Sequence, residues 1–178
     1  MQQQEINIRK AQPEDLGALM EIIGQAVESL KKRGVDQWQD GYPNEEVIRE
    51  DIRKEISYVV CTRADGREKI TATAAISFEP EETYADIYDG NWRGGLPYAV
   101  IHRIATAESC KGRGAAGALI AFVRESCRSR GVKWMRIDTH RDNLVMQNFL
   151  EKHGFEKCGS ITLADGSHRF GFDAPTEQ

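Results

Sequence analysis

Residues 111–117 form a glycine-rich turn that carries two cations, Lys111 and Arg113, and three glycines. Glycine lets the backbone adopt positive φ and approach a ligand closely. A helix is expected to begin in this turn, and the first N–H groups of a helix carry partial positive charge. These features predict a site for a phosphate or pyrophosphate. The alternative is an ordinary strand-to-helix turn with a basic edge, but the two cations, with Gly114 and Ala116 at the helix start, favour phosphate.

The pattern Lys111-x-x-Gly114-x-Ala116 resembles the Arg/Gln-x-x-Gly-x-Gly/Ala signature of the GCN5-related N-acetyltransferase (GNAT) family. In that family the loop holds the pyrophosphate of acetyl-coenzyme A (acetyl-CoA). Lys111 keeps the positive charge but replaces the planar fork of arginine with a point charge. The resemblance covers nearly the whole chain and is strongest from Tyr98 to Phe155.

A second stretch resembles the family's Asn-x-x-Ala-x-x-x-Tyr-x-x-x-Gly-Phe run. It begins at Asn143 and ends at Gly154-Phe155, with Met146 in place of the alanine and Leu150 in place of the tyrosine. That tyrosine is a frequent general acid in the family. The acid is therefore unassigned, and spacing favours none of the candidates, which are Tyr98, His140, Cys158 and a water molecule.

The resemblance implies that an acetyl group passes from acetyl-CoA to a primary amine by direct attack, without an acyl-enzyme and without a metal. The carbonyl oxygen gains negative charge during attack, so the protein must supply a base and an oxyanion donor. A backbone N–H near Ile104 is the expected donor. The cofactor is expected to contact the strand, the turn and the two helices that follow, through Ile104, Ala105, Thr106, Lys111, Gly112, Arg113, Gly114, Ala115, Ala116 and Asn143.

His102 is the expected base. Histidine ordinarily titrates at about pH 6.5, which suits proton removal near neutrality, and His102 matches a strand histidine of one member of the resembled family. Where histone-type members carry an acidic base, this chain has Val100. The alternative is a histidine packed in the sheet and hydrogen-bonded to a neighbour. For Asn143, the alternative to a cofactor contact is a cap at the start of a helix.

Trp38 and Tyr98 are expected to line the acceptor site, although Trp38 is equally suited to plug the space between two helices. The connection from Glu79 to Pro97 contains five acidic residues and one basic residue, Arg93. A solvated acidic loop is the favoured interpretation, and a field that attracts a cationic amine is the alternative. The acceptor stays open among amino acids, polyamines, aminoglycosides, peptide N-termini and lysines.

The elements that must position these residues follow from hydrophobic periodicity. Helices are predicted at 13–33, 44–56 and 113–130, and a fourth helix is predicted from a cap at Asp142 up to residue 153. Strands are predicted at 5–10, 57–63, 69–78, 98–107, 133–139, 155–162 and 168–172. Strict alternation in the central strand would place Val100, His102 and Ile104 on one face. The order βααβββαβαββ predicts one α/β domain over residues 1–178, with a mixed, mostly antiparallel twisted sheet flanked by helices and an acyl-CoA-binding core at about 98–155.

Composition narrows the class of protein. The chain has 178 residues and a net charge of −4, which argues against binding of nucleic acid or a membrane surface. No apolar run approaches the length of a membrane span, and the N-terminus has no signal-peptide core, so no membrane contact is expected. The four cysteines are scattered, which favours reduced thiols and a cytoplasmic location over a zinc site or disulfides. The oligomeric state is open, though two-subunit assemblies are common in the resembled family.

Two other functions fit parts of the sequence. Gly112-x-Gly114-x-x-Gly117 also satisfies a dinucleotide-binding fingerprint, with Asp138 where a ribose-binding acid would be. However, four residues separate the expected strand from the fingerprint, and too little chain follows Asp138 to complete that NAD(P)-binding fold. A non-enzymatic module that binds acyl-CoA would carry the same loop, and the missing tyrosine favours it while His102 argues against it.

Overall fold

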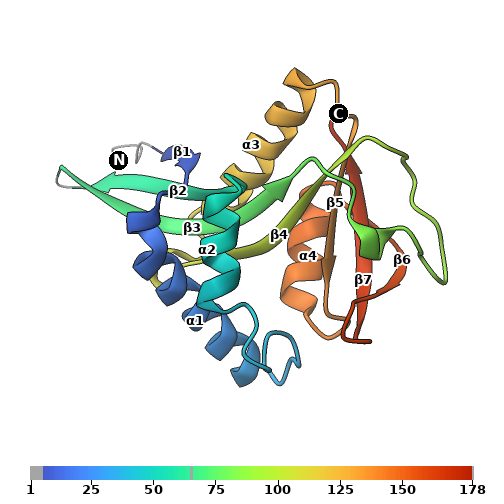
Figure 1. Ribbon diagram of the computed structural model, residues 1–178, viewed down its shortest axis with the longest axis horizontal. Coiled ribbons are helices and arrows are strands. Elements are labelled where there is room, and N and C mark those ends of the chain that lie inside the picture. The colour runs from blue at the N-terminus through green and yellow to red at the C-terminus, as the bar shows by residue number, and fades with distance from the viewer. Residues whose placement is uncertain (1–5, 65, 178) are drawn as a thin grey trace. The chain divides into compact units, whose positions relative to one another are not determined.

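The structure is a computed structural model that describes residues 6–64 and 66–177 (Figure 1). Its strands are β1 (Ile6–Lys10), β2 (Ser57–Ala64), β3 (Arg67–Ser77), β4 (Tyr98–Thr106), β5 (Trp134–Thr139), β6 (Glu156–Thr162) and β7 (His168–Pro175). The helices are α1 (Leu16–Lys32), α2 (Glu45–Arg53), α3 (Ala115–Ser129) and α4 (Leu144–Lys152), and short 3₁₀ turns lie at η1 (Pro13–Asp15), η2 (Glu82–Tyr84) and η3 (Glu108–Cys110). None of these described helices is long and apolar enough to cross a membrane.

The described strands form a sheet in the order β1-β2-β3-β4-β5-β7-β6. The pairs β1–β2, β2–β3, β5–β7 and β6–β7 are antiparallel, whereas β4 and β5 run parallel. This arrangement confirms the predicted α/β class, the element order βααβββαβαββ and the mixed, mostly antiparallel sheet. The chain divides into two compact units, and both β4 and α3 contribute residues to each.

The first unit contains the described parts of 1–34 and 38–76, together with 103–122. The apolar residues of α1 recur at helical spacing, and Leu19 and Ile23 on its inner face are each 1% exposed. They join a cluster of buried residues that also takes members from α2, β2 and the end of β4. This cluster is the core on which the glycine-rich turn of this unit is built.

The predicted start of α2 is confirmed in detail. The Oδ1 atom of Asn44 accepts the backbone N–H of Val47 at 3.0 Å, which satisfies one of the unpaired donors of the first turn. The helix ends at Arg53, three residues before the predicted end at Ile56. A hairpin of β2 and β3 follows, as the turn residues between them predicted.

The second unit contains residues 35–37 and 77–102 and the described residues from 123 onward. In it, the first half of β4 pairs with β5, and β5 pairs with β7. Strands β6 and β7 lie side by side and form the final antiparallel hairpin, as predicted (Figure 1). A cluster of buried residues centred on Tyr84, Tyr98 and Val100 joins the connection of residues 78–97 to β4.

Two ends of helices differ from the prediction. Helix α3 begins at Ala115 and not at Arg113, because η3 and the glycine turn use the residues before it. Helix α4 is capped by Asn143 and not by Asp142: Oδ1 of Asn143 accepts the N–H of Met146 at 3.3 Å. The prediction of strict alternation along β4 is also wrong. Arg103 has φ +52°, so the backbone turns locally into the left-handed region and the pleat is interrupted there.

The connection of residues 78–97 is anchored by a buried carboxylate. Asp173 on β7 is fully buried, and its Oδ1 atom lies 2.7 Å from Nε of Arg93. Its Oδ2 atom accepts the backbone N–H of Arg93 at 2.8 Å. A second arginine, Arg136 on β5, donates to the carbonyl of Gly94 and stacks on the ring of Trp92 at 4.2 Å from the centroid. These contacts fix a segment that the sequence predicted as a solvated loop.

We expect Asp173→Asn to lower the free energy of unfolding by about 2–3 kcal/mol, because it removes the charge that neutralises Arg93 in a buried site. The matched control is Glu156→Gln, which removes the other carboxylate bound to Arg93; its side chain is 67% exposed, and we expect a loss below about 1 kcal/mol. Urea unfolding at pH 7 measures both changes. Equal losses in the two variants would contradict the assignment of Asp173 as the anchor.

Candidate active site

The glycine-rich turn has the backbone conformation that its composition predicted. Gly112 and Gly114 have φ of +74° and +88°, a region that other residues rarely adopt. A Cβ atom built at either position would meet no atom within 4 Å. Glycine is therefore favoured at these positions by the backbone conformation and not by lack of space for a side chain. The chain thereby turns from η3 into α3 within a few residues.

Helix α3 presents its first N–H groups beyond this turn. The N–H of Ala118 is bonded to the carbonyl of Gly114 at 2.9 Å, which is the first bond of the helix. By helix geometry, the N–H groups of Ala115, Ala116 and Gly117 precede that bond and point out of the helix start. The helix has 15 residues, long enough for a full dipole at this end.

The two cations of the turn differ in their surroundings. The Nζ atom of Lys111 forms an ion pair with Glu108 and lies 3.0 Å from Oγ of Ser29. The ion pair is exposed, with 43% of the Lys111 side chain and 61% of the Glu108 side chain accessible. Arg113 is exposed as well. Both cations therefore face solvent, where an anion can reach them.

The strand that leads into the turn carries the other predicted cofactor contacts. Ile104 and Ala105 are buried, and Thr106 is half-buried. Next to them, Arg103 is held by Asp51, with Nε and Nη2 donating to its two carboxylate oxygens at 2.7 and 2.8 Å. Its Nη1 atom donates to the hydroxyl of Tyr42 at 2.8 Å. This bidentate pair stabilises the left-handed residue at which the pleat of β4 is broken.

His102 lies on β4 in the second unit and faces an acidic partner. Its Nε2 atom is 3.1 Å from Oε2 of Glu81, and the side chains are 22% and 29% exposed. The hydrogen bond from His102 lowers the pKa of Glu81 to about 2, although burial acts in the opposite direction. Glu81 is thus an ionised partner of the predicted base. The other four acids of the connection are exposed, as the favoured interpretation expects, whereas Glu81 is half-buried.

Tyr84 and Asp138 form a second polar pair near His102. The hydroxyl of Tyr84 donates to Oδ2 of Asp138 at 2.7 Å, and the Tyr84 ring centroid lies 6.4 Å from that of the His102 ring. Burial raises the pKa of the Tyr84 phenol and of the Asp138 carboxyl. A phenol that is buried and already donating to a carboxylate is a poor proton donor for a departing group.

The predicted acceptor contacts occupy apolar positions. Trp38 packs against the core cluster of the first unit, which favours the plug interpretation. Tyr98 is 4% exposed, and its ring is stacked under the Arg136 guanidinium at 3.9 Å. Its hydroxyl accepts the backbone N–H of Glu81 at 3.2 Å. Tyr98 thus helps to hold the segment that carries Glu81, while contact of either aromatic residue with an acceptor stays a prediction.

Asn143 is buried and already hydrogen-bonded within the protein. Besides capping α4, its Nδ2 atom donates to Oε1 of Gln37 at 3.0 Å and to Oγ1 of Thr139 at 3.3 Å. These bonds favour the capping interpretation over a contact with the cofactor arm. His140 also has a local role, because its Nδ1 atom accepts the N–H of Asp142 at 3.1 Å.

Cys158 is a weak candidate for the missing acid. Burial raises the pKa of its thiol to about 11. An ordinary thiol titrates at about 8.5, so Cys158 holds its proton more tightly than a thiolate leaving group would. Proton transfer from Cys158 to that group is therefore uphill.

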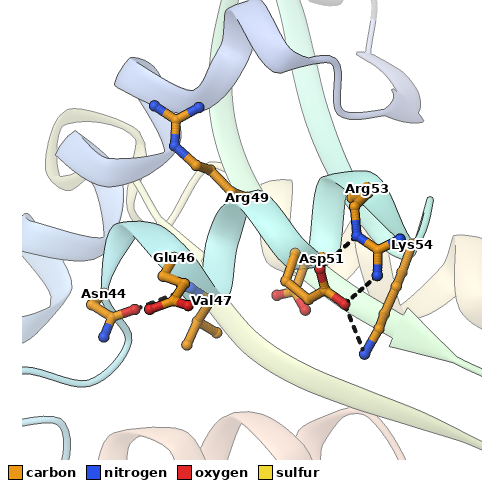
Figure 2. A pocket seen from close by; sticks show the side chains of 8 residues that line it. Asn44, Glu46, Val47, Arg49, Asp51, Arg53 and Lys54 are labelled. Atoms are coloured by element: carbon orange, nitrogen blue, oxygen red, sulfur yellow. Dashed lines mark hydrogen bonds and ion pairs between the residues drawn. The ribbon is translucent and has the colours of Figure 1, made fainter.

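The hollow drawn in Figure 2 lies along α2. Its lining comes from Asn44 to Lys54, and Glu50 within it is paired with Arg53 and Lys54. Charged side chains that neutralise one another on one exposed helix are typical of a solvated surface. Asp51, one of its lining residues, is bonded to Arg103 on β4. We assign no substrate to this hollow.

Comparison with known proteins points to one family. Residues 23–155 match the acetyltransferase (GNAT) family. The structure is similar to an acetyltransferase of the GNAT family from Streptococcus agalactiae 2603, with 33% identity, a TM-score of 0.82, and coverage of 97% of this chain and 96% of that one. A search of proteins with curated functions gave no match.

Two more distant structures share the fold. One is an acetyltransferase of the GNAT family from Listeria monocytogenes 4b F2365, with 18% identity, a TM-score of 0.72, and coverage of 97% of this chain and 95% of that one. The other is a chain of the NatC complex bound to Gag peptide and CoA, with 15% identity, a TM-score of 0.62, and coverage of 96% and 98%.

The contact between Glu81 and His102 predicts a dependence of stability on pH. The folded-state pKa of Glu81 lies below its ordinary value of 4.5, so its contribution to stability is present above pH 4.5 and is lost as the pH falls towards about 2. We expect the difference in unfolding free energy between wild type and Glu81→Gln to shrink over that range in urea titrations. Glu82→Gln, which changes an exposed neighbour, should show no such trend. A difference that stays constant from pH 5 to pH 2 would contradict the pairing.

Proposed function

The chain belongs to the acetyltransferase (GNAT) family, and we propose that it transfers the acetyl group of acetyl-CoA to a primary amine by direct attack. The amine nitrogen forms a bond with the carbonyl carbon, the bond from that carbon to sulfur breaks, and CoA leaves as a thiolate. An amine proton passes to the protein. Because the acetyl group moves directly between the two substrates, no side chain of the protein becomes acylated.

The proposal depends most on the start of α3. We propose that the N–H groups of Ala115 and Ala116 bind the pyrophosphate of the cofactor, with Gly112 and Gly114 allowing its close approach. Lys111 and Arg113 add charge at an exposed edge. The NatC complex, one chain of which has the same fold, was solved with Gag peptide and CoA bound, which is consistent with this assignment.

The strand before the turn is the proposed track for the rest of the cofactor. Backbone groups of Ile104, Ala105 and Thr106 would pair with the pantetheine amides as an added strand pairs with a sheet edge. The N–H of Ile104 would stabilise the oxyanion. Support comes from the local break of β4 at Arg103, because a residue with φ +52° interrupts the regular ladder and changes the direction of the backbone groups that follow it.

His102 is the proposed base. It lies on the same strand, is only partly exposed, and has an ionised carboxylate 3.1 Å from its Nε2 atom. No side-chain acid is assigned, because a CoA thiolate is a tolerable leaving group near neutral pH. The acceptor is a small molecule or peptide that presents a primary amine, and Trp38 and Tyr98 stay candidates to border it.

A dinucleotide-binding protein is not supported. The fingerprint glycines follow a 3₁₀ turn in place of the end of a strand, and the strands beyond Asp138 form an antiparallel hairpin. A module that binds acyl-CoA without catalysis is also disfavoured, since the family that the chain belongs to consists of acetyltransferases. The amine is best sought by a screen in which release of the CoA thiol is detected across amino acids, polyamines, aminoglycosides and peptides.

We expect Ala116→Glu to weaken acetyl-CoA binding at least tenfold, because a carboxylate would occupy and repel the proposed phosphate site. The same charge suits a helix N-terminus and should not lower stability. Ala121→Glu is the matched control, since it places an equal charge at an exposed position further along α3. Calorimetric titration with acetyl-CoA measures both affinities. Wild-type affinity in a folded Ala116→Glu variant would overturn the phosphate assignment.

We expect His102→Gln to lower kcat/KM for the amine found in the screen by about a hundredfold, the usual contribution of a general base. The dissociation constant of acetyl-CoA should change less than about twofold, because the imidazole acts on the amine and not on the cofactor. Initial rates from pH 6 to pH 9 measure the effect. His168→Gln, a change at an exposed histidine, serves as control. Full activity of His102→Gln across this range would exclude His102 as the base.

A further inference from the structure

We propose that Glu81 is a positioning residue that fixes the tautomer and orientation of His102, so that Nδ1 is the atom that takes the proton of the amine. The inference rests on the acetyl transfer proposed above. It adds a residue that lies in the connection before β4, outside every cofactor and acceptor contact expected from the sequence. Its support is a set of three contacts that hold the two side chains in one arrangement.

The first contact sets the tautomer. An ionised carboxylate can only accept hydrogen bonds, so the nitrogen 3.1 Å from Oε2 of Glu81 must carry the proton. That nitrogen is Nε2, which leaves the lone pair of the neutral ring on Nδ1. The assignment follows from the hydrogen-bond network, as tautomers generally do. A histidine in this state accepts a proton at one nitrogen while the other stays bonded to the carboxylate.

Further contacts fix the carboxylate itself. Its Oε1 atom accepts the hydroxyl of Thr83 at 3.1 Å, so the two oxygens of Glu81 have different partners. The backbone N–H of Glu81 donates to the hydroxyl of Tyr98 at 3.2 Å. Tyr98 in turn is buried. The carboxylate is therefore held at both its head and its backbone, which is what orienting an imidazole requires.

Glu81 is unsuited to be the base. Since the hydrogen bond from His102 lowers its pKa to about 2, the carboxylate binds a proton too weakly to remove one from an attacking amine near neutral pH. Its negative charge acts through the ring, by stabilising the imidazolium that forms on proton transfer. In the proposed step, nitrogen bonds to carbon, the carbon–sulfur bond breaks with its electron pair on sulfur, and the amine proton goes to Nδ1 of His102.

Two other titratable groups face His102. Asp138 on β5 and Tyr84 on η2 are bonded to each other, and the Tyr84 ring lies near the imidazole. A negative charge on Asp138 would act on His102 in the same direction as Glu81. Asp138 is bonded to the phenol and not to the imidazole, so only Glu81 sets the tautomer. Asp138→Asn is therefore a second comparison in the test.

The decisive variant is Glu81→Gln, which keeps the shape of the side chain and removes its charge. We expect kcat/KM to fall about tenfold, because an amide can pair with either tautomer of the ring and carries no charge to offset the imidazolium. KM for acetyl-CoA should stay within twofold. Glu82→Gln removes an equal charge from an exposed side chain one residue further along the chain and should leave kcat/KM unchanged.

A second measurement does not depend on turnover. The nitrogen chemical shifts of the His102 ring, assigned by their loss in His102→Gln, distinguish a ring nitrogen that carries a proton from one with a free lone pair. In the neutral ring we expect the proton on Nε2 in wild type and a mixture of both tautomers in Glu81→Gln, whereas Asp138→Asn and Glu82→Gln should keep the wild-type pattern. The wild-type pattern in Glu81→Gln, or a mixture in Glu82→Gln, would overturn the inference. If no amine is acetylated but the tautomer changes as expected, the proposed function fails while the pairing of Glu81 with His102 stands.

Discussion

The positive φ values of Gly112 and Gly114 are the constraint on which the proposed cofactor site depends. They let the chain leave β4, pass through η3 and enter α3 within a few residues. Any other residue at these positions would pay conformational strain, since only glycine adopts this region readily. The proposed anion site is thus a property of the backbone. Side chains around it would adjust its charge but would not create it.

The charge near this site is smaller than the sequence suggests. Lys111 is already paired with Glu108 and bonded to Ser29, so its charge is partly neutralised without ligand. An exposed ion pair of this kind is worth about 0–1 kcal/mol, whereas hydrogen bonds to a phosphate are charge-assisted and stronger. In the proposed site, exchange of Glu108 for a phosphate at Lys111 would therefore cost little. The helix start and Arg113 would supply the remaining attraction.

Local features of the site could be predicted from the sequence, and contacts between distant segments could not. The glycine turn, the cap at Asn44 and the order of elements follow from neighbouring residues, so pattern and propensity were sufficient. The break of β4 at Arg103 could not be predicted, because Arg103 is held by a bidentate contact with Asp51 on α2, which is distant in the sequence. The contact of Glu81 with His102 could not be predicted for the same reason. It is one of several acids in a polar connection, and only the fold brings it to His102.

In the connection that carries Glu81 the acidic residues outnumber the cations, which predicts a solvated loop, but composition does not reveal what a segment is attached to. Arg93 binds the fully buried Asp173, and Arg136 stacks between Trp92 and Tyr98. A carboxylate on a mobile loop would be hydrated and screened, and would neither orient an imidazole nor change its basicity appreciably. The contacts of Arg93 and Arg136 lie away from the imidazole, yet they hold the segment in place and so allow Glu81 to act on His102. The neighbouring Glu82 stays exposed to water.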